Sequence, residues 1–207
     1  MKKALLIGDF DIAPRHSCRG LDEVLRDIYK GLYEISLADE KNHGNLSYGG
    51  LKSYDIVIFM PQKWPETANK DVVCALITYV VRGGSLLSIH RGLIANNTPE
   101  LCLLFAARHI DHAAYVELDF FPAENRGELA DGVAPVTVDD EPHFFELDVF
   151  KKTNVLVELV YGNLKYPAIW YHSWGKGKVA CMAPGRSAES ITAFTRPLIN
   201  IGKWMGD

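Results

Sequence analysis

Short apolar runs alternate with segments of helical periodicity through the first half of the sequence, and this alternation most constrains the fold. Four runs have the length and composition of strands buried on both faces, at 3–10, 33–39, 54–60 and 85–90. Three segments carry apolar residues at helical spacing, at 19–32, 69–84 and 98–110. This alternation predicts an α/β fold in which a mainly parallel sheet has helices on both faces.

The pattern changes in the second half, where strand-like runs follow one another between turns. They lie at 114–121, 134–138, 154–161, 167–174 and 177–184, and a helix is expected at 189–205. We expect these strands, some of them antiparallel, to extend one edge of the same sheet. The sequence has no internal repeat and no linker-like stretch, so we expect a single domain over 1–207.

Composition limits the partners. The 22 basic and 26 acidic residues give a net charge of −4 without a long run of either sign, so we expect no nucleic-acid partner. The longest apolar run, 72–81, is too short to cross a bilayer, which predicts a cytoplasmic protein with no membrane partner. The expected partner is a small molecule. Whether copies of the chain form a homo-oligomer is left open.

Ligands of open parallel sheets bind beyond the carboxyl ends of the strands. The loops expected there carry many polar and aromatic side chains. In the first half these include His16, Trp64, His90 and Arg91. In the second half they include Asp140, Glu141, His143, Trp170, His172 and Arg186.

His90 stands at the turn between an apolar strand and an expected helix. In several α/β enzyme families this position holds a nucleophilic Cys or Ser, with backbone N–H groups around it. Imidazole lacks the acyl-transfer chemistry of a thiolate, so His90 is a candidate acid/base, a hydrogen-bonding group for a ligand, or a metal ligand. The alternative is a buried histidine with a structural role.

Four quoted stretches carry a family resemblance: "YDIVIFMPQKW", "ALITYVVRGGSLLSIHRG", "VTVDDEPHFFEL" and "YPAIWYHSWGKGKVACMAPG". In this order they resemble the ThuA-like family of the class I glutamine amidotransferase-like superfamily. The resemblance implies a flavodoxin-like three-layer sandwich. It also implies that His90 occupies the position of the nucleophilic Cys in amidotransferase relatives, so we expect no glutamine hydrolysis.

The resemblance further suggests catalytic roles for His90, Glu141 and His16. Asp140 and Glu141 match the acidic pair of the family, and His16 falls where a histidine often follows the first strand. His143 stands where an aromatic residue is usual. The sequence also departs from the pattern in that Arg186 replaces the histidine of a terminal Gly-His and the usual His-Pro before the acidic pair is absent.

The remaining candidates are expected to bind substrate, although each has a simpler interpretation. Trp170 is either a packing residue of the core or a platform on which a sugar ring stacks. The acidic cluster at 139–141 is either a solvated turn or part of the site. Arg91, His172 and Trp64 are included because they lie in the loops at the expected binding edge.

Two classes of function follow. The resemblance favours a protein that binds or processes a sugar or keto-sugar in trehalose-type carbohydrate utilisation. The alternative is a non-catalytic amidotransferase-like domain that binds a small molecule or serves as an oligomeric scaffold. The chain lacks dinucleotide and phosphate-loop fingerprints, so no cofactor is expected. A metal ion on His90, His143 or His172 with a carboxylate is chemically sensible, but no HxH or HExxH spacing is present.

Overall fold

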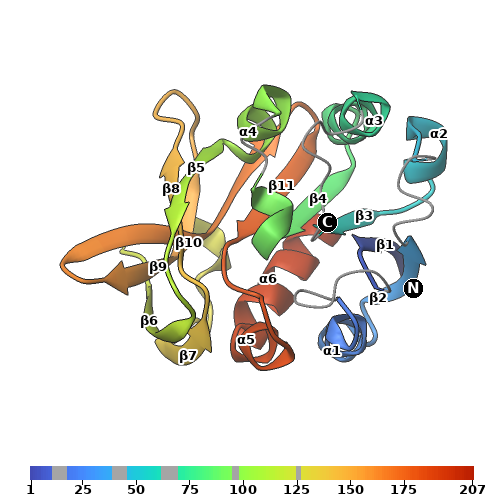
Figure 1. The fold of residues 1–207 in the computed structure, drawn as a ribbon. Helices are drawn as coiled ribbons and strands as arrows, with labels where there is room; N and C mark the ends of the chain where they lie inside the picture. Colours follow the sequence, from blue (N-terminus) through green and yellow to red (C-terminus); the bar gives the residue numbers. More distant parts are fainter. Residues whose placement is uncertain (11–17, 39–45, 62–69, 95–97, 125–126) are drawn as a thin grey trace.

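The sheet at the centre of the molecule has nine strands (Figure 1). The computed structural model describes residues 1–10, 18–38, 46–61, 70–94, 98–124 and 127–207. Five adjacent strands are parallel, in the order β2 (Tyr33–Ala38), β1 (Lys2–Gly8), β3 (Ile56–Met60), β4 (Ser85–Ile89) and β11 (Gly177–Met182). The strand predicted at 85–90 is therefore internal, with a parallel neighbour on each side.

The parallel strands are apolar on both faces because both faces are covered. Along β1, Ala4 and Leu6 pack into one core layer, whereas Leu5 and Ile7 pack into the other. This alternation is the two-residue period of a strand. Figure 1 shows the helices that form the outer layers. On one face lie α1 (Leu21–Ile28), α5 (Ala188–Ala193) and α6 (Thr195–Gly206), and on the other α2 (Tyr48–Leu51), α3 (Lys70–Val81) and α4 (Pro99–Phe105).

Antiparallel strands continue the sheet beyond β11. Their order is β10 (Leu164–Trp174), β9 (Asn154–Tyr161), β6 (Val116–Pro122) and β7 (Val136–Asp140). A separate two-stranded antiparallel sheet consists of β5 (Ala107–His112) and β8 (His143–Leu147). The described residues also include the short 3₁₀ turns η2 (His90–Leu93) and η3 (Gly127–Leu129). The predicted fold class, a flavodoxin-like α/β sandwich with antiparallel strands at one edge, is confirmed.

Two predicted helices differ from the structure. The helix expected at 98–110 ends at Phe105, because Ala106 adopts the left-handed conformation with φ 53° and the chain continues as β5. The helix expected at 189–205 is interrupted at Phe194, between α5 and α6. Pro197 lies in the first turn of α6, where it has no N–H for a bond back to the preceding turn.

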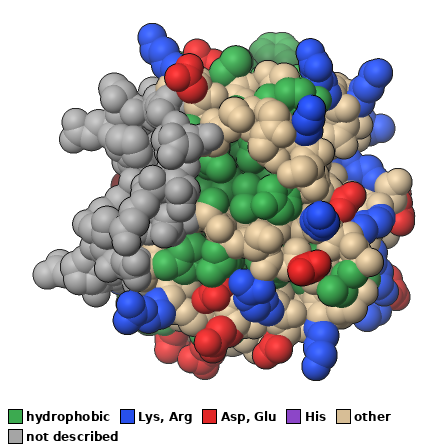
Figure 2. Space-filling model, turned by 90° about the vertical axis from the view of Figure 1, so that its right-hand side faces the viewer, with side chains coloured by type: hydrophobic (Ala, Val, Ile, Leu, Met, Phe, Trp, Pro, Cys, Tyr) green, Lys and Arg blue, Asp and Glu red, His purple; other side chains and the backbone are tan. Residues whose placement is uncertain are grey.

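The open edge of the parallel part is formed by β2. Figure 2 looks onto this side of the molecule and shows hydrophobic side chains gathered near the middle of the face, with charged side chains around them. On β2 itself, Leu37 is 44% exposed. No helix in the described part of the chain has the length and hydropathy needed to cross a membrane.

Candidate functional site

His90 lies at the carboxyl end of β4, in a backbone conformation that few residues adopt. Its φ is 51°, and among the described non-glycine residues only Ala106 shares a positive φ. Backbone strain of this kind often occurs at functional sites, including the nucleophile turn of α/β enzymes. Gly92 lets the turn approach the end of β3, because a Cβ there would collide with the carbonyl oxygen of Phe59.

The connection between β7 and β8 brings the acidic pair to the same place. Asp140 is fully buried, and its carboxylate accepts hydrogen bonds from the backbone N–H of Glu141 at 2.6 Å and of Gly185 at 2.7 Å. It also accepts from the hydroxyl of Ser190 at the start of α5. Asp140 therefore positions its neighbour, while the side chain of Glu141 extends toward His90.

Three of the predicted residues converge into what we call the His–Glu cluster: His90, Glu141 and His143. The Oε2 atom of Glu141 lies 3.8 Å from Nε2 of His90 and 3.6 Å from Nε2 of His143. All three atoms lie within 4.8 Å of one another, an arrangement that could hold a metal ion. His90 and His143 are almost completely buried, whereas 12% of the Glu141 side chain is exposed.

Two further histidines lie beside the cluster, and neither was predicted from the sequence as a site residue. On β5, His109 Nε2 lies 3.1 Å from His143 Nδ1. The half-exposed His112 places Nδ1 3.4 Å from Oε1 of Glu141. Their three-residue spacing was the available signal, but it fell across the expected end of a helix. Pairing of β5 with β8 brings both rings to the cluster.

Burial keeps the clustered imidazoles neutral. It is the main reason that the pKa of His90 is lowered, although Asp140 and Glu141 oppose the shift. Burial also lowers the pKa of His143 to about 2, with further contributions from His90 and His109. The dipole of the helix expected after His90 would also keep the ring neutral. The structure has instead the four-residue 3₁₀ turn η2, so desolvation rather than a helix dipole is the leading cause.

Arg186 brings a positive charge to Glu141 of the cluster. Its Nη1 atom lies 2.9 Å from Oε2 of Glu141, and its guanidinium lies over the exposed ring of Tyr115 at 5.2 Å. The oxygen still has no bond that meets hydrogen-bond geometry among the described residues. Arg91 follows His90 within η2 and is half-buried. Its charge contributes to the lowered pKa of His143.

Other predicted residues lie elsewhere. Trp170 is fully buried in β10, where its indole N–H donates to the carbonyl oxygen of Phe105 at 2.9 Å. His172, also on β10, donates from Nε2 to the carbonyl oxygen of Leu104 at 3.0 Å. Burial lowers its pKa to about 4. Both side chains are therefore engaged in the core between β10 and α4. His16 and Trp64 lie outside the described residues.

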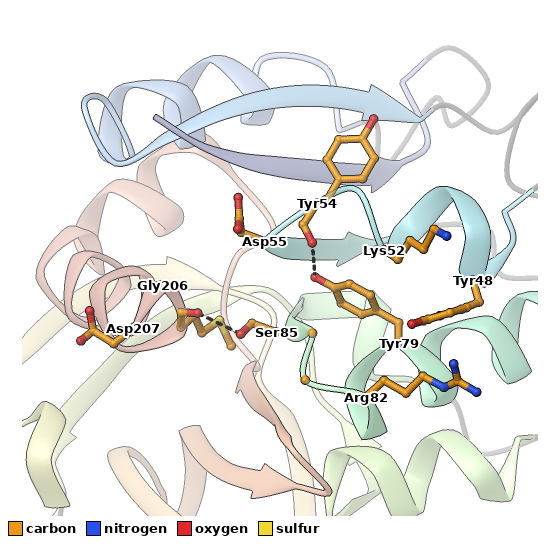
Figure 3. Close-up of a pocket in the computed structure, with 12 residues that line it drawn as sticks. Tyr48, Lys52, Tyr54, Asp55, Tyr79, Arg82, Ser85, Gly206 and Asp207 are labelled. Carbon is orange, nitrogen blue, oxygen red and sulfur yellow. Dashed lines mark hydrogen bonds between the residues drawn. The ribbon is translucent and has the colours of Figure 1, made fainter.

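A cavity of about 330 Å³ lies at the opposite end of the parallel strands (Figure 3). Asp55 precedes β3 and Ser85 begins β4, so this cavity is at their amino ends. Figure 3 shows the hydroxyl of Tyr79 donating to the carbonyl oxygen of Tyr54, at 3.0 Å. The location differs from the carboxyl-end edge where ligands of such sheets bind. The His–Glu cluster remains the better candidate site.

The fold and the cluster define a flavodoxin-like α/β protein with a histidine at the turn after β4. The ThuA family model, described as "Trehalose utilisation", matches residues 13–199. This chain belongs to the ThuA family. The description of the family supports a role in carbohydrate utilisation in general. Among curated proteins, none matches the sequence.

Solved structures share the fold over almost the whole chain. A ThuA-like protein from Parabacteroides merdae superposes with a TM-score of 0.78 at 14% identity, covering 99% of this chain and 90% of that one. A ThuA-like protein from Bacteroides uniformis gives 0.77 at 16% identity, with 99% and 91% covered. A cytoplasmic protein from Salmonella typhimurium gives 0.68 at 15% identity, with 99% and 96% covered.

Proposed function

We propose that this chain binds or processes a sugar or keto-sugar at the His–Glu cluster, as part of carbohydrate utilisation. The family description supports the general role. The observation that carries the location is the convergence of His90 Nε2, His143 Nε2 and Glu141 Oε2, which are buried and have no hydrogen-bond partner among the described residues. Buried polar atoms of native proteins normally have partners, so two imidazole nitrogens without one, beside a carboxylate oxygen that is paired only with Arg186 and the histidines, favour a ligand.

The chemistry of the cluster suits a polyhydroxylated ligand. A carboxylate and a neutral imidazole can accept the protons of sugar hydroxyls, and the imidazole can return one. The guanidinium of Arg186 can donate to a carbonyl or hydroxyl oxygen. A gradient of exposure gives access, since side-chain exposure rises from 12% at Glu141 to 28% at Arg186 and 54% at His112. A ligand approaching from this side would meet Arg186 and His112 first and the cluster beneath them.

Glutamine hydrolysis is not part of this proposal. The family resemblance implies that His90 occupies the position of the nucleophile, and Cys181 on β11, the strand adjacent to β4, is fully buried. Burial raises the pKa of that thiol well above its usual range, which disfavours the reactive thiolate. We expect no ammonia release from glutamine that depends on a cysteine.

Calorimetric titration with trehalose and with an oxidised, keto form of trehalose tests the proposal. Glu141→Gln keeps the shape of the side chain but removes its charge, and should weaken sugar binding by roughly 10-fold or more. The matched control is Glu146→Gln, on the exposed face of β8, which should bind like the wild type. His90→Asn is preferable to alanine, because asparagine tolerates the left-handed backbone.

Thermal unfolding of each variant separates binding from folding. Weaker binding with a small change in Tm supports a site role for His90 and Glu141. A wild-type protein that binds neither sugar at millimolar concentration, or equal binding by both glutamate variants, would reject the proposal. Unchanged binding by His90→Asn with a large loss of stability would assign His90 to the core.

A further inference from the structure

The hydrogen bonds of His90 determine which of its nitrogens carries the proton. Its Nδ1 lies 3.2 Å from the carbonyl oxygen of Ala183, and a carbonyl oxygen can only accept. The neutral ring therefore has its proton on Nδ1. Consequently Nε2 carries a lone pair, and that lone pair is directed into the His–Glu cluster.

A chain of two hydrogen bonds sets the tautomer of His143. His109 also has a hydrogen bond with the backbone of Asp111, and we assign this bond to its Nδ1 as donor and the carbonyl oxygen as acceptor. Its other nitrogen, Nε2, then accepts, and His143 Nδ1 must donate across the 3.1 Å contact. Nε2 of His143 is left with a lone pair, as in His90.

The cluster thus brings together the lone pairs of two imidazole nitrogens and a carboxylate oxygen that also pairs with Arg186. The two imidazole nitrogens face Oε2 of Glu141 at 3.8 and 3.6 Å, and none of the three atoms has a hydrogen-bond partner among the described residues. Buried lone pairs without a partner are costly. Arg186 approaches the carboxylate, but no bond from it to either imidazole occurs in the described structure.

We propose that His90 Nε2, His143 Nε2 and Glu141 Oε2 bind one divalent first-row transition-metal ion, with Zn²⁺ as the representative. Two imidazoles and one carboxylate form a donor set that suits Zn²⁺ or Fe²⁺, whereas Mg²⁺ and Ca²⁺ prefer oxygen ligands. Bonds of about 2.0–2.2 Å in a tetrahedral site separate ligand atoms by roughly 3.4 Å. The two distances from Glu141 Oε2, 3.6 and 3.8 Å, are close to this spacing, and the two imidazole nitrogens, which lie within 4.8 Å of each other, reach it by rotation of the side chains.

The surroundings of the cluster resemble the outer shell of a metal site. Metal-ligating histidines almost always donate their second N–H to a fixed acceptor, which orients the ring. Here the carbonyl oxygen of Ala183 accepts from Nδ1 of His90, and Nε2 of His109 accepts from Nδ1 of His143. Arg186 and His112 approach Glu141 from the more exposed side and would orient its carboxylate. Three protein ligands leave a fourth position open for water or a ligand oxygen.

The metal site deepens the proposed function. It rests on that function only in naming a sugar as the ligand of the open coordination position. An ion there would take a hydroxyl or carbonyl oxygen of the sugar and polarise it. The ion itself is inferred from the tautomers and the distances, independently of any sugar.

Zinc titration of chelator-treated protein, followed by calorimetry and elemental analysis, tests the site. The wild type should bind one Zn²⁺ per chain. His143→Gln and Glu141→Gln should each weaken binding about 100-fold or more, since each removes a direct ligand. The matched control is His172→Gln, which replaces another buried histidine whose Nδ1 has no partner among the described residues, and it should bind like the wild type. Wild-type protein that binds no stoichiometric Zn²⁺, or equal affinity in all four proteins, would overturn the inference.

Cobalt absorption of the wild-type protein provides a test that does not depend on a variant's folding. Co²⁺ in this donor set should give visible bands of low symmetry without an intense thiolate-to-metal band. A strong thiolate band would place the ion on cysteine and reject the site.

Sugar titrations separate this inference from the proposed function. Zinc binding without sugar binding would leave the metal site and reject the proposed function. Sugar binding that is identical before and after removal of the metal would uphold the proposed function and reject the ion's part in it.

Discussion

The parallel and antiparallel parts of the sheet contribute unequally to the candidate site. The parallel part supplies one member of the His–Glu cluster, His90, held at the end of β4. The other two members follow β7, at the opposite edge of the nine-stranded sheet, and the histidines around them come from β5. A regular, doubly covered scaffold thus presents one constrained residue, and the irregular part brings the remaining polar groups to it.

The two parts meet at the carboxylate of Asp140. This residue ends β7, yet its hydrogen bonds reach Gly185, after β11, and Ser190, in α5. It therefore connects the far antiparallel edge to the parallel region and fixes the backbone beside Glu141. We therefore expect substitution of Asp140 to weaken the contact between the two parts more than substitution of any exposed residue does.

Asp140→Ala is expected to have the largest effect. The substitution leaves the N–H groups of Glu141 and Gly185 and the hydroxyl of Ser190 without their acceptor, which should lower the free energy of unfolding by about 3 kcal/mol or more. Chemical denaturation followed by fluorescence measures the change. The matched control is Asp139→Ala, since Asp139 is exposed, and its effect should stay within about 0.5 kcal/mol. Similar losses in the two variants would mean that Asp140 does not join the two parts.

His172→Gln should separate a structural histidine from those of the cluster. Burial lowers the pKa of His172 to about 4, so the unfolded chain binds this proton more readily than the folded protein. Its contribution is therefore fully present above the unfolded value of about 6.5 and is lost as the pH falls from there toward 4. Between pH 7 and pH 5 the wild type should lose about 2 kcal/mol more stability than the variant.

Glutamine is chosen because its amide can still donate to the carbonyl oxygen of Leu104 but does not titrate. Denaturation curves of both proteins at several pH values give the difference, and the other histidines cancel because the two proteins share them. Parallel stability curves over this range would show that His172 takes up its proton equally well in the folded state.

The sequence predicts the parallel part well because its physical signals are local. Apolar runs bounded by glycine and helical spacing of apolar residues fix β1, β3, β4 and α3 to within a few residues. The same logic fails at Ala106, where a helix-like pattern continues through "FAARHI" but the left-handed backbone begins a strand. Pairing between β5 and β8 is a long-range interaction that no local pattern records.

The candidate site was predicted as a set of residues but not as a geometry. His90, Glu141 and His143 were all named from the sequence, but 51 residues separate His90 from Glu141, so no ligand spacing was available to connect them. His109 and His112 were missed with the strand that carries them. The structural roles of Trp170 and Asp140 could not be predicted either, because their hydrogen bonds inside the protein are to backbone groups that are distant in the sequence.

The smallest expected effect concerns the β5–β8 sheet, the element that sequence patterns missed. An ion pair across this sheet joins Nη2 of Arg108 to Oε2 of Glu146 at 2.8 Å, but both side chains are more than half exposed. Such pairs contribute about 0.2–1 kcal/mol, since water already solvates both charges. The buried side of the same sheet has Phe145, whose ring lies 5.2 Å from the rings of His109 and Trp170. We therefore expect packing, rather than the ion pair, to hold this sheet against the core.

A double-mutant cycle with Arg108→Ala and Glu146→Ala measures the pair directly. The coupling free energy should be below about 0.5 kcal/mol at moderate ionic strength and should fall further as salt is added. Phe145→Leu in the wild-type protein should lower the free energy of unfolding by more than this coupling free energy, because it removes buried ring contacts. If the coupling exceeded the cost of Phe145→Leu, the sheet that positions His109 and His112 would depend on its surface charges. Binding at the His–Glu cluster would then be expected to weaken with salt as well.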